Sequence, residues 1–186
     1  MNTITIVTGL PRSGTSLMMQ ILNQSSLPLF IDGVREKDIN NPKGYFELEA
    51  VKKIVKDNSF LNDAHGKAVK IVCPLPMYLD LNFKYRVLVM RRNMEEILSS
   101  QEKMLNKDQS GIKISFSKIY TNHLDRMYAF FKKNNIDYID VWYPELIANS
   151  EEVIDGIVKF CKLENNLKEL KNVISPDLYR NKNEAK

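Results

Sequence analysis

The sequence has few of the residues that form metal centres and covalent crosslinks. Its 186 residues include only two cysteines and two histidines. Cys73 and Cys161 lie far apart inside apolar runs, a pattern that favours buried free thiols in a reducing compartment over a disulfide. With so few sulfur and imidazole ligands no metal-binding cluster can be assembled, so we expect no metal.

Long apolar runs are also missing. The apolar stretch over residues 4–10 is too short for a transmembrane helix or a signal peptide. We therefore expect a cytoplasmic protein that has no membrane partner. The net charge of +4 is mild, the lysines are scattered, and no RNA-binding or zinc-finger signature is present. Nucleic acid is therefore not an expected partner.

What is present is the composition of a soluble globular protein, with 44% hydrophobic and 27% charged residues. The length indicates one domain over residues 1–186. Short apolar runs alternate with stretches of helical periodicity, which predicts an α/β fold of three layers with a largely parallel central sheet. The expected strands are residues 3–8, 68–73, 85–90 and 137–142. The first expected helix begins near residue 17. The other expected helices cover about residues 47–61, 94–105, 115–133 and 151–161.

Periodicity also predicts which side chains face the core. The helix over residues 47–61 should bury Val51, Ile54, Val55 and Leu61, and the helix over residues 115–133 should bury Ile119, Leu124, Met127, Phe130 and Phe131. Asn93 is expected to cap the helix that follows it, with Glu96 completing a capping box. The connection over residues 23–44 is long and rich in Pro, Asn, Asp and Gly, which is typical of a lid or substrate loop.

The N-terminal letters ITIVTGLPRSGTS describe an apolar strand that runs into a short glycine-containing loop. Gly9, Gly14 and Ser16 have the spacing of the nucleotide-binding pattern G-x-x-x-x-G-K-[ST], but Thr15 stands in the lysine position. The loop's only cation is Arg12. A kinase or ATPase directs the missing lysine at the β- and γ-phosphates, so we expect a phosphate-like ligand other than ATP used as a phosphoryl donor.

The rest of the loop supports an anion site. The apolar residues after it recur at helical spacing, and a helix N-terminus offers unpaired N–H groups and a positive dipole end to an anion. Ser13, Thr15 and Ser16 add hydroxyl donors, and Arg12 adds a planar guanidinium. The alternative interpretation is a strand–turn–helix corner whose glycines serve only the turn; the arginine and three hydroxyls favour the anion site.

A second group of polar residues follows the third expected strand, in the letters YRVLVMRRNMEEILSSQ. Arg92 and Ser100 are eight residues apart and lie on a similar side of the expected helix, so both can reach one anion if the arginine bends back along the helix axis. Arg91 and Ser99 have the same spacing, so the register is open. The alternative is an arginine pair at a sheet edge followed by ordinary helix serines.

Together the two segments resemble the sulfotransferases that use 3'-phosphoadenosine 5'-phosphosulfate (PAPS). That family has a P-[KR]-S-G-T-[ST] loop that holds the 5'-phosphosulfate, and an Arg followed by Ser eight residues later that holds the 3'-phosphate. The resemblance implies that the 5'-phosphosulfate is bound by Pro11, Arg12, Ser13, Gly14, Thr15 and Ser16. It assigns the 3'-phosphate to Arg92 and Ser100.

Further segments are similar to a compact bacterial branch of this family: NPKGYFELEA, GKAVKIVCPLP, VWYPELIANSEEVI and SPDLYRNK. The chain departs from the cytosolic enzymes in two ways. Their glycine-rich C-terminal R-K-G segment is absent, with only Arg180 in a comparable place, and no histidine stands where they keep their catalytic base.

Sulfuryl transfer needs a base near the acceptor and a cation near the leaving oxygen. Because related sulfotransferases without the histidine use glutamate, Glu47 is the first candidate for the base, followed by Glu49, with His65 as the rival. Glu47 could instead only complement a helix N-terminus, and His65 could be a solvated loop residue. Arg12 is the first candidate for the cation and Lys70 the second.

The sequence therefore predicts a PAPS-dependent sulfotransferase that acts on a hydroxyl or amine of a small-molecule or carbohydrate-like acceptor, with PAPS as co-substrate. Two alternatives are a P-loop kinase of small molecules and a non-catalytic nucleotide-binding domain of the same fold. The identity of the acceptor and the oligomeric state stay open.

Overall fold

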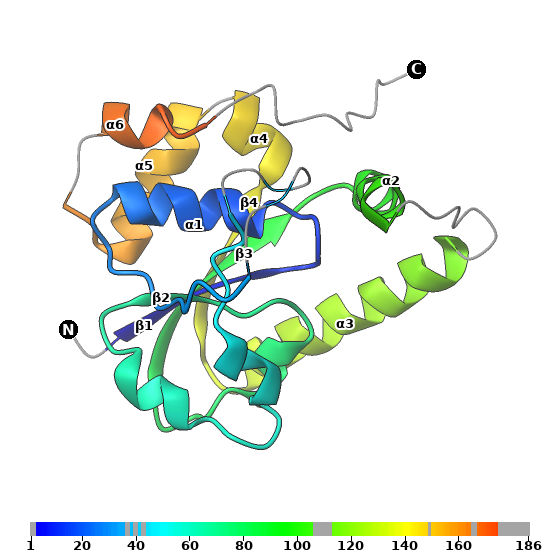
Figure 1. The fold of residues 1–186 in the computed structure, drawn as a ribbon, viewed down its shortest axis with the longest axis horizontal. Coiled ribbons are helices and arrows are strands. Elements are labelled where there is room, and N and C mark those ends of the chain that lie inside the picture. The colour runs from blue at the N-terminus through cyan, green and yellow to red at the C-terminus, as the bar shows by residue number, and fades with distance from the viewer. Residues whose placement is uncertain are drawn as a thin grey trace.

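A parallel four-stranded sheet forms the centre of the protein (Figure 1). The computed structural model describes residues 3–35, 38, 41, 44–105, 113–148, 150–164 and 167–174. The strands are β1 (Thr3–Gly9), β2 (Ala68–Lys70), β3 (Lys84–Arg91) and β4 (Asp137–Trp142), in the order β2-β1-β3-β4. All three pairings are parallel, which confirms the predicted fold class.

Helices cover both faces of the sheet. They are α1 (Thr15–Gln24), α2 (Met94–Leu105), α3 (Lys113–Lys133), α4 (Tyr143–Ala148), α5 (Ser150–Cys161) and α6 (Leu167–Lys171). Short 3₁₀ helices are η1 (Glu49–Lys53), η2 (Ser59–Asp63) and η3 (Leu75–Tyr78). In Figure 1, α1, α4, α5 and α6 lie on one side of the sheet and α3 on the other.

Two apolar cores result from this layering. Val7, Leu88 and Met90 face the core under α1 and α5, whereas Ile6 and Val87 face the core under α3 and the 3₁₀ helices. The central strands β1 and β3 are therefore buried on both faces, as near-continuous apolar runs in a parallel sheet require.

The helix predicted over residues 47–61 is wrong, because the structure has two 3₁₀ helices there. Polar side chains interrupt the backbone ladder between them: Asn58 Nδ2 donates to the carbonyl of Ile54, and the N–H of Ser59 donates to Asp57 Oδ1. Such local bonds compete with helix formation. As a result Val55, predicted to be buried, is 56% exposed.

The long helix α3 was predicted nearly at its observed bounds. Leu124, Met127 and Phe131 are buried as expected, but Ile119 is 47% exposed. Tyr120, next to it, is partly buried against the core, and its hydroxyl donates to Gln101 Oε1 of α2. The contact between α2 and α3 decides which side of this helix faces inward.

Both cysteines are free and buried, as predicted. Burial raises the pKa of each thiol to about 12, so neither is a reactive thiolate at neutral pH. Within the described ranges, no helix has both the length and the apolar character to cross a bilayer.

The order of the strands indicates where a ligand would bind, at the carboxyl ends of β1 and β3. From β1 the chain passes to β2 on one side, and then returns to β3 on the other side of β1. The carboxyl ends of β1 and β3 thus meet at the point where the strand order reverses. Ligands of open α/β sheets bind at such points.

Candidate active site

The loop between β1 and α1 depends on glycine at both ends. Gly9 and Gly14 have φ angles of 142° and 104°, a region that L-residues rarely adopt. A Cβ atom on Gly14 would lie 2.4 Å from the ring of Tyr143, and one on Gly9 would lie 2.5 Å from the carbonyl oxygen of Met90. The loop is therefore pressed against the ends of β3 and β4, and only glycine fits at these positions.

Ser13 directs a buried hydroxyl into this loop. Its Oγ atom would lie 2.5 Å from a Cβ on Gly9, so it occupies the inside of the turn. This oxygen is inaccessible to solvent and has no hydrogen-bond partner within the described part of the chain. Leaving a buried hydroxyl unpaired costs about 1–3 kcal/mol, a cost that a bound ligand would remove.

The start of α1 is similarly open to an anion. Gly14 is its N-cap and provides no side-chain hydrogen bond, and the first turn contains no acidic residue. The first N–H groups of a helix have no partner within it and point along the positive end of its dipole. Together with Ser13, they form a site for a multi-oxygen anion.

The two segments singled out in the sequence meet at this loop. Nε of Arg12 donates to Oγ of Ser100 over 3.0 Å, and Nη1 of Arg12 lies 3.7 Å from the sulfur of Met104. Arg92 donates from Nη1 to the carbonyl of Arg12 over 3.3 Å. Burial lowers the pKa of Arg12, and the neighbouring charge of Arg92 acts in the same direction. Two cations and a hydroxyl thus converge beside the helix N-terminus.

The two adjacent arginines point in different directions. Arg92 pairs with Glu96 over 2.8 Å in a nearly buried contact, and its guanidinium lies 4.8 Å from the ring centre of Tyr143. Arg91 donates instead to the hydroxyl of Tyr128 over 2.7 Å. Strand alternation places Arg91 on the α3 side of the sheet. The geometry therefore favours the register of Arg92 with Ser100.

Glu96 forms an ion pair that the sequence did not predict. Its carboxylate accepts from Arg92, and the Asn93 side chain caps α2 by accepting from the N–H of Glu95 over 2.8 Å. This ion pair holds the Arg92 side chain in the position from which its Nη1 atom reaches the carbonyl of Arg12 in the loop. The sequence spacing alone did not show this, since Glu96 also fits a capping box.

Described residues of the connection between α1 and β2 fold against the loop. Asn41 Nδ2 donates to Oγ of Ser16 over 2.9 Å. The hydroxyl of Tyr45 donates to Asp38 Oδ2 over 2.7 Å, and burial together with that hydrogen bond raises the pKa of Tyr45. The sequence analysis did not single out Asp38, Asn41 or Tyr45, although the segment NPKGYFELEA contains Asn41 and Tyr45.

Glu47 lies in a cluster of charges at the end of this connection. Its Oε1 atom is 3.2 Å from Nζ of Lys70 and 3.0 Å from Nη1 of Arg35. Burial opposes ionisation of Glu47, but the two cations outweigh it and lower its pKa. The residue precedes η1 and does not cap a helix, so its alternative role is ion pairing rather than capping.

Lys70 is the buried partner in this cluster. Only 3% of its side chain is exposed, and it also donates to the backbone carbonyl of Tyr45. Burial lowers its pKa, while the charge of Glu47 opposes that change. Arg35 completes the cluster by stacking 3.5 Å above the centre of the Tyr45 ring.

His65 and Glu49 lie away from the site. His65 is exposed, packs against Phe83 at a ring distance of 5.4 Å, and precedes β2 where the N–H of Gly66 bonds to Thr3. It is therefore at the amino end of the sheet, roughly 20 Å along β1 from the loop at 3.3 Å per residue. The structure therefore does not bring His65 to the loop. Glu49 is exposed and pairs with Lys52. Arg180 lies outside the described residues.

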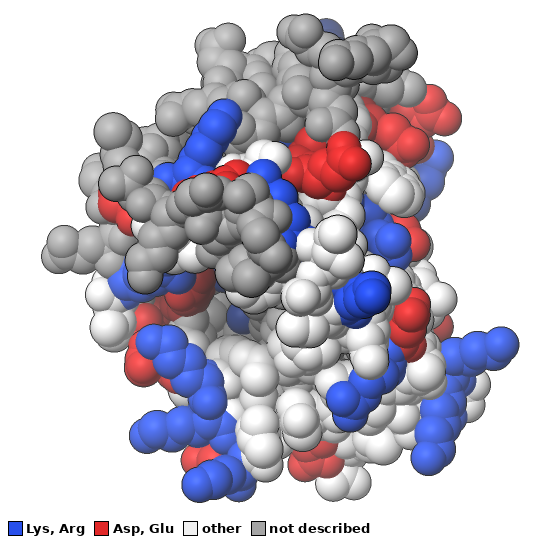
Figure 2. All heavy atoms as spheres, turned by 90° about the vertical axis from the view of Figure 1, so that its right-hand side faces the viewer, with Lys and Arg blue, Asp and Glu red and all other residues white. Residues whose placement is uncertain are grey.

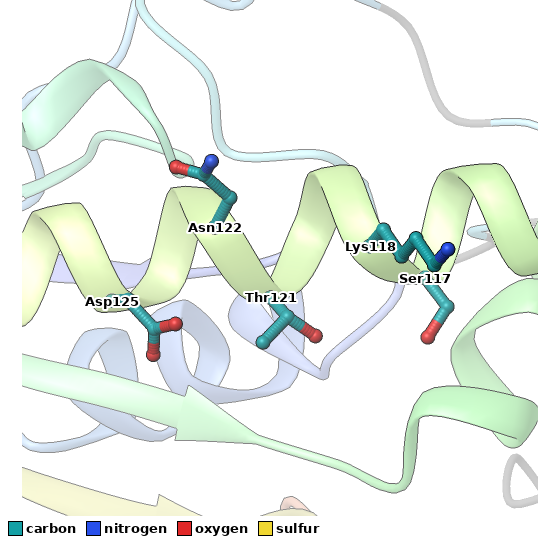
Figure 3. Close-up of a pocket in the computed structure, with 5 residues that line it drawn as sticks. All are labelled: Ser117, Lys118, Thr121, Asn122 and Asp125. Atoms are coloured by element: carbon teal, nitrogen blue, oxygen red, sulfur yellow. The ribbon is translucent and has the colours of Figure 1, made fainter.

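A separate polar hollow lies along α3. Five side chains line it: Ser117, Lys118, Thr121, Asn122 and Asp125. In Figure 3, Ser117, Thr121 and Asp125 point to one side of the helix, and Asn122 points to the other. Figure 2 shows the right-hand side of the molecule in Figure 1, where the coloured basic and acidic side chains are interspersed rather than gathered into one patch.

Three solved structures that are similar to this chain are sulfotransferases or sulfotransferase domains. The chain matches the sulfotransferase domain from the curacin biosynthetic pathway at 15% identity and a TM-score of 0.57, over 96% of this chain and 80% of that one. Sulfotransferase STF9 from Mycobacterium avium matches at 12% identity and 0.54, over 92% and 66%. The sulfotransferase domain from the Synechococcus PCC 7002 olefin synthase matches at 14% identity and 0.50, over 96% and 79%.

By sequence, no protein-family model and no curated protein matches. The likeness to the three structures concerns the fold, and the chain has the sulfotransferase fold over almost its whole length.

Proposed function

We propose that this chain transfers a sulfuryl group from PAPS to a hydroxyl or amine of a small-molecule or carbohydrate-like acceptor. One observation carries the proposal: Arg12 of the loop and Ser100 of α2, 88 residues apart, are joined by a hydrogen bond, and Arg92 reaches the same loop. Two anion-binding segments in contact suit a nucleotide with phosphate groups at both its 5' and 3' positions. The sulfotransferase fold supports this assignment.

The residues at the sheet edge fit such a donor. The unpartnered hydroxyl of Ser13 and the open N-terminus of α1 would hold the 5'-phosphosulfate, and Arg92 and Ser100 would hold the 3'-phosphate. When bound, PAPS supplies an activated sulfuryl group. Arg12 is placed to neutralise negative charge that develops in the loop. Glu47, ionised at neutral pH, is the proposed acceptor of the proton from the attacking group.

A small-molecule kinase is less consistent with the site. Thr15 stands where the kinase lysine would be, and β3 ends in Arg91 and is followed by Arg92 rather than by a metal-holding aspartate. Magnesium-dependent hydrolysis of ATP above the level of a Gly14→Val control would support the kinase. We expect no such hydrolysis.

Adenosine 3',5'-bisphosphate should raise the melting temperature far more than ADP at equal concentration. The bisphosphate can fill both anion positions, whereas ADP has no 3'-phosphate for Arg92. Stabilisation follows RT ln(1 + [L]/Kd), about 2.7 kcal/mol at a hundredfold excess of ligand over Kd. Thermal unfolding with each nucleotide measures the difference. Equal shifts would remove the second anion position from the proposal.

Arg92→Ala should weaken binding of adenosine 3',5'-bisphosphate by about 1.5–3 kcal/mol, the range of a charge-assisted hydrogen bond, with little effect on ADP. Titration calorimetry on the folded variant measures both. Because the change also leaves the Glu96 carboxylate without Arg92, Arg92→Lys is a milder second variant. Arg91→Ala is the matched control and should bind within about twofold of the parent chain. A larger loss in Arg91→Ala would reverse the register.

Binding and catalysis are separated by following PAPS itself. Release of adenosine 3',5'-bisphosphate from PAPS in the presence of hydroxyl and amine acceptors would establish sulfuryl transfer. Tight binding of the bisphosphate without any release over a broad acceptor set would instead favour the non-catalytic nucleotide-binding domain.

A further inference from the structure

Asn41 contacts the phosphate loop from outside its motif. This residue lies in the connection between α1 and β2, and its Nδ2 atom donates to Oγ of Ser16 over 2.9 Å. We propose that Asn41 is a positioning residue, which by this hydrogen bond directs the hydroxyl hydrogen of Ser16 toward the anion in the loop. The inference rests on the proposed function only in taking that anion to be the 5'-phosphate group of the donor.

The direction of the hydrogen bond is the basis of the inference. A serine hydroxyl has one hydrogen and two lone pairs. Since Asn41 donates, it occupies a lone pair of Ser16 and leaves the single hydrogen for another acceptor. Ser16 lies in the first turn of α1, where the helix dipole already favours negative charge. The hydroxyl is thus prepared as a donor before an anion arrives, which is how preorganised sites stabilise charge.

Asn41 is itself held in place through its backbone N–H and carbonyl groups. Its N–H donates to Asp38 Oδ1 over 3.0 Å, and its carbonyl accepts from the N–H of Gly44 over 3.0 Å. The other carboxylate oxygen of Asp38 accepts from the hydroxyl of Tyr45. Tyr45 in turn lies against Arg35 and provides its carbonyl to Lys70. Hydrogen bonds therefore connect the donor loop continuously with the charge cluster around Glu47.

The Asn41→Asp variant tests the direction of the bond. A carboxylate can only accept, so it would capture the hydroxyl hydrogen of Ser16 and add negative charge beside the loop. We expect adenosine 3',5'-bisphosphate to bind about tenfold more weakly or worse in Asn41→Asp, and only about threefold more weakly in Asn41→Ala, where the hydroxyl remains free to donate. Titration calorimetry measures both. Asn62→Asp, with the same charge change on η2, is the matched control and should bind like the parent chain.

A double-mutant cycle with Ser16→Ala isolates the hydroxyl. Ser16→Ala should weaken binding about fivefold in the parent chain and less than about twofold in Asn41→Asp, where the hydroxyl is already captured. Equal losses in both backgrounds would overturn the inference. Unchanged affinity of Asn41→Asp for the bisphosphate would also overturn the inference. It would mean that the Ser16 hydroxyl already donates to Asn41 in the parent chain.

Inorganic pyrophosphate separates this inference from the proposed function. Pyrophosphate can occupy the loop without a nucleoside. Its affinity for the same series of variants is therefore measured as well. The expected pattern with pyrophosphate but no binding of the bisphosphate would reject the proposed donor and retain the role of Asn41. Absence of binding by both anions would reject both.

Discussion

Replacing Glu47 by glutamine is expected to lower kcat by about 10²–10⁴, the usual contribution of a general base. Affinity for adenosine 3',5'-bisphosphate should stay within about twofold, because a base acts on the transition state and contributes little to donor binding. Steady-state rates and titration calorimetry measure the two effects. Glutamine keeps the size and hydrogen-bonding capacity of the side chain, so the variant removes basicity more than shape.

Glu49→Gln is the matched control for this prediction. Glu49 is two residues along the chain but is exposed and pairs with Lys52 over 2.7 Å. We expect its kcat to remain within about twofold of the parent chain. Near-full turnover by Glu47→Gln would instead reduce Glu47 to a partner of Lys70 and Arg35 and move the base elsewhere.

The pH dependence gives the same prediction a second measurement. Burial opposes ionisation of Glu47, but Lys70 and Arg35 outweigh it and hold its pKa below its ordinary value of 4.5. Because the pKa is lowered in the folded chain, the ion pairs stabilise the fold fully above the unfolded pKa, and this stability is lost as pH falls through the folded pKa. Glu47 is thus already ionised at neutral pH. An acidic limb of kcat/KM between about pH 5 and 8 would assign the base to another group.

Arg12→Ala is expected to lower kcat by about 10²–10³, the effect of removing one donor aimed at developing charge. The backbone at position 12 has a φ angle of 70°, which is equally unfavourable for arginine and for alanine. The substitution therefore leaves the strain of the loop nearly unchanged. Arg12→Lys should recover part of the rate, since it restores the charge but not the planar guanidinium. Rates at saturating PAPS measure the series.

Arg126→Ala, on the exposed side of α3, is the control for Arg12→Ala and should leave kcat unchanged. Because Arg12 also contacts Ser100, we expect Arg12→Ala to change the affinity for the bisphosphate as well. A variant that loses bisphosphate affinity but keeps kcat would make Arg12 a donor-binding residue rather than the cation of the transfer step.

Strands were the most predictable part of this fold. The stretches 3–8, 85–90 and 137–142 correspond to β1, β3 and β4 within one or two residues. The central strands β1 and β3 are buried on both faces and read as continuous apolar runs, whereas β4 is a largely exposed edge strand. The stretch 47–61 was mistaken for one helix, because Asp57 and Asn58 form local hydrogen bonds that periodicity does not reveal. Element type is thus predictable where burial dominates and less so where side chains compete with the backbone.

By itself, the sequence determined the local chemistry of the loop. Two glycines at positive φ, a buried serine and an uncapped helix start follow one another within a few residues, so their spacing is enough to predict an anion site. The same holds for the spacing of Arg92 and Ser100 along one helix.

Only the tertiary structure decided which of these groups meet. The contact of Arg12 with Ser100 spans 88 residues, and that of Asn41 with Ser16 spans 25. Strand register turned Arg91 toward Tyr128 and Arg92 toward the loop, and placed His65 at the opposite end of the sheet from Gly9. Such outcomes depend on how parallel strands pair and on which face each side chain takes. Pairing is set by packing over the whole domain, whereas the patterns that a sequence displays extend only over a helix turn or a strand.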